Sequence, residues 1–231
     1  MMRRVRQCCS SLVVSLALTH PVGAQWPATL SSSEAADIGL GRVVVLQLDV
    51  AGSPWPRVRL YRFIDATPEQ SLAMLADYAH RRDYIVDLKE ARIDRQLDSG
   101  RTEVFFRYAS NVPFVPDVSY TLLDRLHRDQ DGSYSIHWNL QSGRKVKRVE
   151  GSARFSQWIN PANGRVGTLL TYDNYVVPDF PFASLGVVRQ KAIAAMRDAV
   201  DAIATEVERE KAHDRPRLER QVAALRIALA H

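Results

Sequence analysis

The sequence IDATPEQ, at positions 64–70, marks the point where a predicted strand passes into a predicted helix. Thr67 is a typical N-cap residue, Pro68 suits the first helical position, and Gln70 stands where its side chain can bond back to the amide of the cap. Apolar residues then recur at spacings of three and four, as on one face of a helix. A helix is therefore predicted to begin at Pro68.

Short elements surround this helix. Residues 42–50 and 57–64 are rich in β-branched residues and bounded by turn residues, which predicts two strands. Residues 33–41 predict one or two helical turns before these strands, and residues 80–86 predict a second short helix after the first. Two short helices are thus expected to follow the first strands.

Beyond these helices the pattern changes to about five strand-length segments that run from Leu88 to Val177. Turn sequences separate them, at 98–100, 111–113, 129–132, 142–143 and 160–164. Because no connection is long enough for a crossover helix, the strands must pair mostly antiparallel.

The last predicted elements are helical. Residues 183–211 place apolar side chains on one stripe, which predicts an amphipathic helix of roughly 40 Å. Pro216 ends the pattern, and a short helix follows within 213–231. Its narrow apolar seam consists of Leu218, Val222, Leu225 and Leu229. We expect this terminal seam to pack on its own domain, and a partner interface is the alternative.

This order of elements predicts an α+β helix-grip fold, in which a curved antiparallel sheet wraps around the long C-terminal helix. Three stretches carry a family resemblance: IDATPEQ leading to Leu75-Ala76-Asp77-Tyr78, then Tyr84-Ile85-Val86-Asp87-Leu88-Lys89-Glu90-Ala91-Arg92-Ile93, and Gly167-Thr168-Leu169-Leu170-Thr171-Tyr172. They resemble the START-like (SRPBCC) superfamily, which includes polyketide cyclases, coenzyme Q-binding proteins and birch-pollen-allergen-like proteins. The resemblance covers about residues 42–211 and implies a fold more than an activity. Val118 stands where many relatives have an Arg, so the resemblance does not extend to a shared ligand.

The first 24 residues predict a secretory signal peptide. Basic residues precede the apolar run 12–18, and small residues stand before a cleavage position near Ala24. The run is shorter than the roughly 20 apolar residues of a membrane-spanning helix. We therefore expect a periplasmic or secreted protein with a lead-in segment at 25–41, a START-like ligand-binding domain at 42–212 and a C-terminal helix at 213–231.

Charge and cysteine content exclude several function classes. After removal of residues 1–24 the chain has 28 basic and 26 acidic side chains, so we expect no nucleic-acid partner. Cys8 and Cys9 both lie in the removed segment, which leaves no disulfide, thiolate metal site or cysteine nucleophile. The histidines have no metal-ligand spacing, and the sequence has no nucleophile elbow or dinucleotide-binding loop. We therefore assign no catalytic residue, metal or cofactor.

A ligand-binding cavity is expected between the curved sheet and the long helix. Small residues on the helix, Ala192, Ala195 and Ala199, favour a hollow that side chains leave unfilled. Aromatic residues alternate with polar ones on the strands and would line this hollow. The candidate ligand-binding residues are Phe106, Tyr108, Tyr120, Trp138, Phe155, Tyr172, Phe180 and Met196. The alternative is that these side chains simply complete the core.

Two proline-containing loops, at 111–117 and 177–186, are candidate gates over this cavity or else rigid strand ends. Their aromatic residues are Phe114, Phe180 and Phe182. The basic run 144–148 predicts an exposed hairpin end, and contact with anionic lipid headgroups is its functional alternative.

Charged residues around the two short helices are predicted to be solvated. Acidic and basic side chains alternate there, which favours surface ion pairs over acid–base catalysis. They are Asp77, Asp83, Asp87 and Glu90, beside Arg81, Arg82, Lys89 and Arg92. His137 lies between two apolar residues of a strand, so we expect it on the opposite, solvated face.

Together these features predict an exported monomer that binds a hydrophobic small molecule and carries or shields it. The ligand would be a lipid, an isoprenoid or a polycyclic compound, and contact with a membrane surface would be transient. The alternative is a cyclase- or aromatase-type enzyme, which two or more titratable side chains converging in the cavity would favour. A third hypothesis is an interaction module with a filled interior that binds a partner through the terminal seam.

Overall fold

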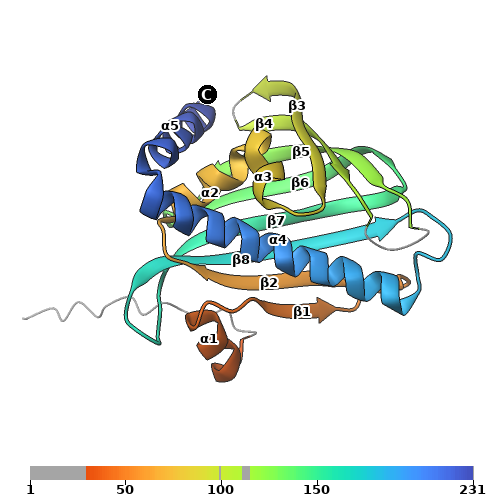
Figure 1. The fold of residues 1–231 in the computed structure, drawn as a ribbon, viewed down its shortest axis with the longest axis horizontal. Coiled ribbons are helices and arrows are strands. Elements are labelled where there is room, and N and C mark those ends of the chain that lie inside the picture. The colour runs from red at the N-terminus through yellow and green to blue at the C-terminus, as the bar shows by residue number, and fades with distance from the viewer. Residues whose placement is uncertain (1–29, 99, 111–114, 231) are drawn as a thin grey trace, which may run out of the picture.

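The computed structural model describes residues 30–98, 100–110 and 115–230. The predicted signal peptide and Phe114 lie outside these residues. The described chain forms one eight-stranded sheet with helices packed on it (Figure 1), and none of these helices is long and apolar enough to cross a membrane. The elements in chain order are α1 (Ser32–Gly39), β1 (Val44–Leu48), β2 (Arg57–Ile64), α2 (Pro68–Ala76), a 3₁₀ turn (Tyr78–His80), α3 (Arg81–Tyr84), β3 (Leu88–Asp98), β4 (Arg101–Tyr108), β5 (Val118–Arg128), β6 (Tyr134–Arg144), β7 (Val146–Ile159), β8 (Val166–Pro178), α4 (Gly186–His213) and α5 (Arg215–Ala230).

The sheet is antiparallel throughout, with the strand order β1-β2-β8-β7-β6-β5-β4-β3. The pairing of β2 with β8 joins the first strands of the chain to the last, and β1 and β3 form the edges. The sheet curves, and α4 crosses one face of it (Figure 1). The predicted α+β helix-grip fold is confirmed.

The helix predicted from the IDATPEQ stretch is α2, which begins at Pro68. Its capping box is complete: the Gln70 amide donates to Thr67 Oγ1 at 3.2 Å, and the Thr67 amide donates to Gln70 Oε1 at 3.0 Å. These bonds satisfy two amides that would otherwise lack partners at the start of the helix. The cap thereby fixes where α2 enters the core, in which Leu72 and Leu75 are buried.

Among the described residues six strands lie between the short helices and α4, where about five are expected from the sequence. The turn expected at 142–143 is wrong, because β6 continues to Arg144 and the chain reverses at Lys145, whose φ is 67°. Gly143 instead allows close packing, since a Cβ there would lie 2.5 Å from Val146 Cγ1. In a sequence, a glycine that permits such an approach looks like a turn glycine.

The main core lies between the sheet and the helices α2, α4 and α5. In α5, Leu218 and Leu225 are buried in this core, and Val222 and Leu229 pack against it. The terminal seam therefore packs on its own domain, as expected. Pro216 lies in the first turn of α5, where the missing amide is tolerated.

The long helix α4 is buried unevenly along its length. In its second half (200–213), buried side chains recur at spacings of three and four from Val200 to Glu210, the pattern of a helix face against a core. In its first half (186–199), only Val188 is fully buried, and Ala195 is exposed. The expectation that Ala195 faces the sheet is therefore wrong.

Candidate functional site

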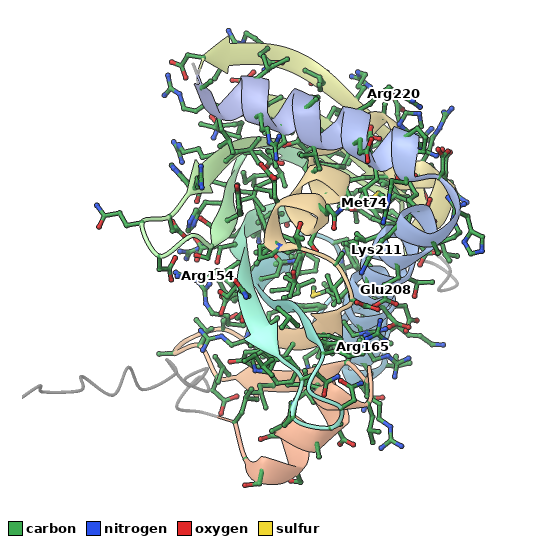
Figure 2. The ribbon with its side chains drawn as sticks, turned by 90° about the vertical axis from the view of Figure 1, so that its left-hand side faces the viewer. Met74, Arg154, Arg165, Glu208, Lys211 and Arg220 are labelled. Carbon is green, nitrogen blue, oxygen red and sulfur yellow. The ribbon has the colours of Figure 1, made fainter. Side chains whose placement is uncertain are left out.

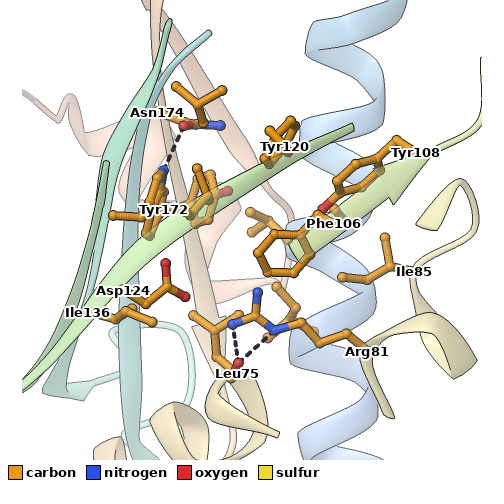
Figure 3. A pocket seen from close by; sticks show the side chains of 16 residues that line it. Leu75, Arg81, Ile85, Phe106, Tyr108, Tyr120, Asp124, Ile136, Tyr172 and Asn174 are labelled. Atoms are coloured by element: carbon orange, nitrogen blue, oxygen red, sulfur yellow. Dashed lines mark hydrogen bonds between the residues drawn. The ribbon is translucent and has the colours of Figure 1, made fainter. Parts of the chain in front are cut away.

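A cavity of about 70 Å³ lies between the sheet and the middle of α4 (Figure 3). Strands β4, β5, β6 and β8 supply its aromatic side chains, and Ala199 and Ile203 of α4 close it from the other side. Five of the eight candidate ligand-binding residues line it: Phe106, Tyr108, Tyr120, Trp138 and Tyr172.

The other three candidates lie outside the cavity lining. Phe155 is fully buried in the main core, and Phe180 packs with Trp55 in a separate cluster. Met196 is half-buried, and its sulfur lies 3.9 Å from Asn174 Nδ2. Ligand binding by any of the eight residues stays a prediction.

The cavity is small for a ligand-binding site. Its volume of about 70 Å³ is well below the range of about 300–1,000 Å³ that small-molecule pockets span. Aromatic rings fill the interior, since the ring centroids of Tyr108 and Tyr120 lie 5.9 Å apart and those of Trp138 and Tyr172 lie 5.1 Å apart. Of the three alanines expected to leave a hollow, only Ala199 lines the cavity. Side chains therefore fill much of the space that was expected to be a hollow.

Asp124 brings a carboxylate into this apolar interior. It follows Tyr120 and Leu122 at alternate positions of β5, so all three side chains point to the same face of the sheet. Asp124 is 2% exposed, and its Oδ1 has no hydrogen-bond partner among the described residues. Burial raises the pKa of Asp124 to about 6, although the Arg81 charge opposes the shift. Asp124 is not among the residues predicted from the sequence, although its alternation with Tyr120 places it on the same face.

Arg81, from α3, brings a cation to the same cavity (Figure 3). Its Nε donates to the Leu75 carbonyl at 2.7 Å, and its Nη2 donates to the same oxygen. The guanidinium carbon lies 4.5 Å from the ring centroid of Tyr78 and 5.3 Å from that of Phe106. Because Leu75 stands near the end of α2, where carbonyls lack intrahelical partners, Arg81 completes that helix end. The expectation that Arg81 forms a solvated ion pair is therefore wrong.

The polar groups of the cavity are only partly satisfied by one another. Among the described residues no ion pair joins Arg81 to Asp124, although both line the cavity (Figure 3). The Tyr78 hydroxyl, just outside the lining, is also buried without a hydrogen-bond partner, and burial together with the Asp124 charge raises its pKa. Burial likewise raises the pKa of Tyr108 and of Tyr120, so these hydroxyls stay protonated at neutral pH. The cavity thus offers a ligand one carboxylate acceptor, one cationic donor and neutral hydroxyls.

Two of the surface ion pairs expected near the short helices are present: Arg82 Nε lies 3.8 Å from Asp83 Oδ1, and Arg92 pairs with Glu90. Asp77 instead contacts a histidine, since its Oδ1 lies 2.8 Å from His80 Nδ1. His137 is exposed, as its place between two apolar residues predicted. Within residues 30–98, 100–110 and 115–230, no group of three or more His, Cys, Asp or Glu side chains is placed to hold a metal ion.

Comparisons with known proteins place the fold but not the activity. No family model and no curated protein matches the sequence. A STAR-related lipid transfer protein from Xanthomonas axonopodis is 16% identical, with a TM-score of 0.60 over 71% of this chain and 93% of that chain. Human StAR-related lipid transfer protein 5 is 12% identical, with a TM-score of 0.57 over 73% of this chain and 83% of that chain. Human STARD10 is 15% identical, with a TM-score of 0.55 over 74% of this chain and 73% of that chain. The resemblance to the START-like superfamily is thereby confirmed as a shared fold.

Proposed function

We propose that this chain, which has the START-like helix-grip fold, binds a hydrophobic small molecule between its sheet and α4 and carries or shields it. One observation carries the proposal: an aromatic cavity holds a buried carboxylate with an unpartnered oxygen, on Asp124, and a buried guanidinium, on Arg81. A buried polar group without a partner is destabilising, and a ligand group that bonds to both residues would remove that penalty.

The class of ligand follows from these two groups. A hydroxyl can donate to the Asp124 carboxylate and accept from the Arg81 guanidinium, so one hydroxyl satisfies both. The aromatic walls suit an apolar body, whose burial contributes about 25 cal/mol per Å². The ligand is therefore an apolar alcohol from the lipids, isoprenoids or polycyclic compounds.

Such a ligand needs more room than 70 Å³, and the first half of α4 is where the fold can provide it. Near the cavity, Val118, Tyr120 and Leu140 of the sheet are only half-buried. On the helix itself no side chain between Val188 and Val200 is fully buried. Movement of this half away from the sheet would extend the cavity and leave the main core intact, and only the small cluster of Val188 with Trp55 and Tyr175 would have to open.

Native mass spectrometry of the full chain with farnesol, cholesterol or hexadecanol tests the proposal. We expect at least one of these alcohols to bind at one molecule per chain. The variant Ala199→Phe fills the cavity and should abolish binding. The matched variant Ala195→Phe adds the same ring to an exposed position of the same helix and should leave binding unchanged.

Thermal unfolding of both variants checks that the fold is retained. Absence of binding by the wild-type chain to all three alcohols would overturn the proposal. Equal binding by Ala199→Phe and Ala195→Phe would place the ligand elsewhere on the molecule.

Catalysis of the cyclase or aromatase type is a second candidate function, and the convergence of titratable groups favours it. Asp124 has a pKa of about 6, raised by burial, and the protonated Tyr108 and Tyr120 hydroxyls lie in the same cavity. A carboxyl that titrates near neutral pH is suited to proton transfer. Such an enzyme would fold a poly-β-ketone and remove a proton from the carbon that forms the new bond.

Incubation with a poly-β-ketone separates the two functions. A carrier returns the compound with its mass unchanged, whereas a cyclase returns a product lighter by one water. In the second case Asp124→Asn should abolish turnover while the compound still binds. An unchanged mass with the wild-type chain would reject the enzyme.

We also propose that the chain is exported and that it is a monomer. The predicted signal peptide at 1–24 supports transfer to the periplasm or the medium. Expression of the full chain with its own N-terminus, followed by fractionation and N-terminal sequencing, should recover a mature chain that begins near Gln25. Sedimentation of that chain should give the mass of one copy.

A membrane surface is the proposed place of ligand exchange, and one end of the molecule supports it. Phe182 is 76% exposed in the loop between β8 and α4 (Figure 1), and Leu185 and Val187 beside it are also exposed. The basic hairpin 144–148 adjoins this loop, because the Asp179 amide donates to the Lys145 carbonyl at 2.9 Å. Exposed apolar side chains beside lysines and arginines suit an anionic lipid surface.

Vesicle co-sedimentation tests this contact. We expect the chain to bind vesicles that contain phosphatidylglycerol more strongly than vesicles of phosphatidylcholine alone. Phe182→Ser should weaken that binding several-fold, since the side chain inserts between lipids. The control Ile227→Ser changes an exposed apolar residue of α5 and should have no effect. Equal binding by the two variants would exclude the loop as the contact.

A further inference from the structure

A groove of about 660 Å³ lies between α2, α5 and the strands β3–β5, apart from the cavity described above. Figure 2 shows α5 lying across this part of the molecule, with Arg220 on it. The groove volume falls within the range of about 300–1,000 Å³ that is common for small-molecule sites. The groove is thus large enough for a ligand without any movement of the chain.

The walls of the groove are apolar because small residues face each other across two helices. Ala73 and Ala76 line it from α2, and Ala224 and Ala228 line it from α5. Larger side chains would close the space between these helices. Ile93, which is 51% exposed on β3, adds apolar surface at the side of the sheet. An apolar body of an alkyl or ring type therefore fits between α2 and α5.

The charges of the groove favour an anion. Asp77 is its acidic lining residue, and it already accepts bonds from His80 at 2.8 Å and from Gln221 Nε2 at 2.7 Å. Arg217 lies 3.0 Å from the buried Glu210. Arg220 has no ion-pair partner among the described residues, although it lines the groove and is exposed. One cation is therefore available to a ligand, and the carboxylate that opposes it is occupied.

Gln221 adds a second polar feature to the groove. Its Nε2 must face the Asp77 carboxylate, which only accepts, so its Oε1 is fixed as the free end of the amide. That oxygen is buried without a hydrogen-bond partner, in a residue that is 9% exposed and lines the groove. An unpartnered buried acceptor is destabilising. A donor on a ligand that reaches this oxygen would relieve that penalty.

We propose that this groove is a second ligand site, which binds an amphipathic organic monoanion. The apolar body of the ligand lies between the alanines of α2 and α5, and its carboxylate pairs with Arg220. A hydroxylated long-chain or polycyclic carboxylate would use Gln221 as well. The proposal does not depend on ligand binding in the inner cavity.

Titration with two fluorescent probes of equal length tests the proposal. One is 11-(dansylamino)undecanoic acid, and the other is the matching dansyl alcohol, which has no charge. We expect the acid to bind the full chain more tightly than the alcohol at low salt. Arg220→Ala should weaken binding of the acid by about two- to five-fold and leave the alcohol unchanged. The control Arg215→Ala removes an exposed cation outside the groove and should change neither affinity.

A second pair of variants tests the walls. Ala224→Trp fills the groove and should abolish binding of both probes, whereas Ala223→Trp changes an exposed neighbour on α5 and should not. The variant Ala199→Phe, which fills the inner cavity, should also leave both affinities unchanged. Failure of both probes to bind the wild-type chain would overturn the proposal. Loss of binding in Ala199→Phe with retention in Ala224→Trp would move the probes to the inner cavity and overturn it as well.

Discussion

The two halves of α4 meet the same sheet in different ways. The second half is held in the main core, where Val200, Ile203 and Val207 are each no more than 3% exposed and α2 and α5 pack beside them. The first half has one fully buried side chain, Val188, which packs with Trp55 and Tyr175 in a small separate cluster. One helix therefore combines an anchor, which is its second half (200–213), with a loosely packed cover, which is its first half (186–199).

This difference shows how a helix-grip fold can be stable and still accept a ligand. Stability resides where large apolar side chains interlock at high density. Room for a ligand can be gained where the helix carries small or half-buried side chains, because little contact is lost when it moves. The cavity lies at the junction, where Ala199 belongs to the cover and Ile203 to the anchor.

The largest expected effect comes from truncating the same residue type in each half. Ile203→Ala should lower the free energy of unfolding by about 4 kcal/mol, because it removes a fully buried side chain and enlarges a cavity. Ile193→Ala removes a half-buried side chain and should lower it by about 1 kcal/mol. Urea unfolding followed by circular dichroism measures both. Equal losses would show that the two halves are packed alike.

The second-largest effect is expected in the pH dependence of stability, through the Asp124 carboxyl in the cavity. The pKa of Asp124 is about 6 in the folded chain and about 3.9 when unfolded, so between these values the folded chain binds more protons. The stabilisation from its protonation is complete below about pH 3.9 and is lost as pH rises through 6. Relative to Asp124→Asn, the wild-type chain should lose about 2–3 kcal/mol between pH 4 and pH 7. Urea unfolding at both pH values measures this, and parallel pH profiles would contradict it.

A smaller difference is expected in local opening of the helix. Amides in the first half of α4 should exchange hydrogen at least about ten-fold faster than amides in the second half, equivalent to about 1.4 kcal/mol of opening free energy. Hydrogen exchange read by mass spectrometry measures this on the unmodified chain. A bound apolar alcohol should slow exchange in the first half and leave the second half unchanged. Uniform exchange along α4 would remove the distinction.

The smallest effect on the free energy of unfolding is expected for the ion pair that Asp201 of the anchor forms with Arg62. Asp201 accepts from Arg62 Nε at 2.9 Å, but its side chain is 53% exposed. Asp201→Ala should therefore lower the free energy of unfolding by about 0.5 kcal/mol. Asp198→Ala removes an exposed partner of the neighbouring Arg197 and should have no measurable effect. A loss for Asp201→Ala as large as that for Ile203→Ala would mean that the ion pair, not apolar packing, holds the anchor.

Most of the fold could be predicted from the sequence because its signals are local. The Thr67 cap, the turn residues between strands and the apolar stripe of α4 each depend on residues close together in the chain. Predictions were wrong where a residue type that is typical of a local element is instead needed for a contact between elements. The sequence pattern predicts a turn at Gly143, although this glycine permits two strands to approach, and it predicts that Ala195 faces the sheet, although Ala195 is exposed.

The candidate site could be predicted only in part. The alternation of aromatic residues indicated five cavity-lining side chains, and the same alternation would have included Asp124. Arg81 could not be found in this way, since it stands next to the exposed Arg82 and only the end of α2 determines which of the two turns inward. The cavity volume was beyond the sequence, because it depends on how rings from four strands pack against one another.

The edge strand β3 affects how this protein behaves among copies of itself. It runs for 11 residues with an unpaired side, which is the kind of edge that recruits further strands and seeds aggregation. Its register against β4 shifts at three places, and its exposed surface carries charges of both signs. They are Lys89, Glu90, Arg92, Asp94 and Arg95. A second copy of β3 docked in register would place each charge beside the same charge of the other copy, and the irregular register would interrupt the hydrogen bonds between the two strands. Concentrated solutions should therefore stay free of fibrils.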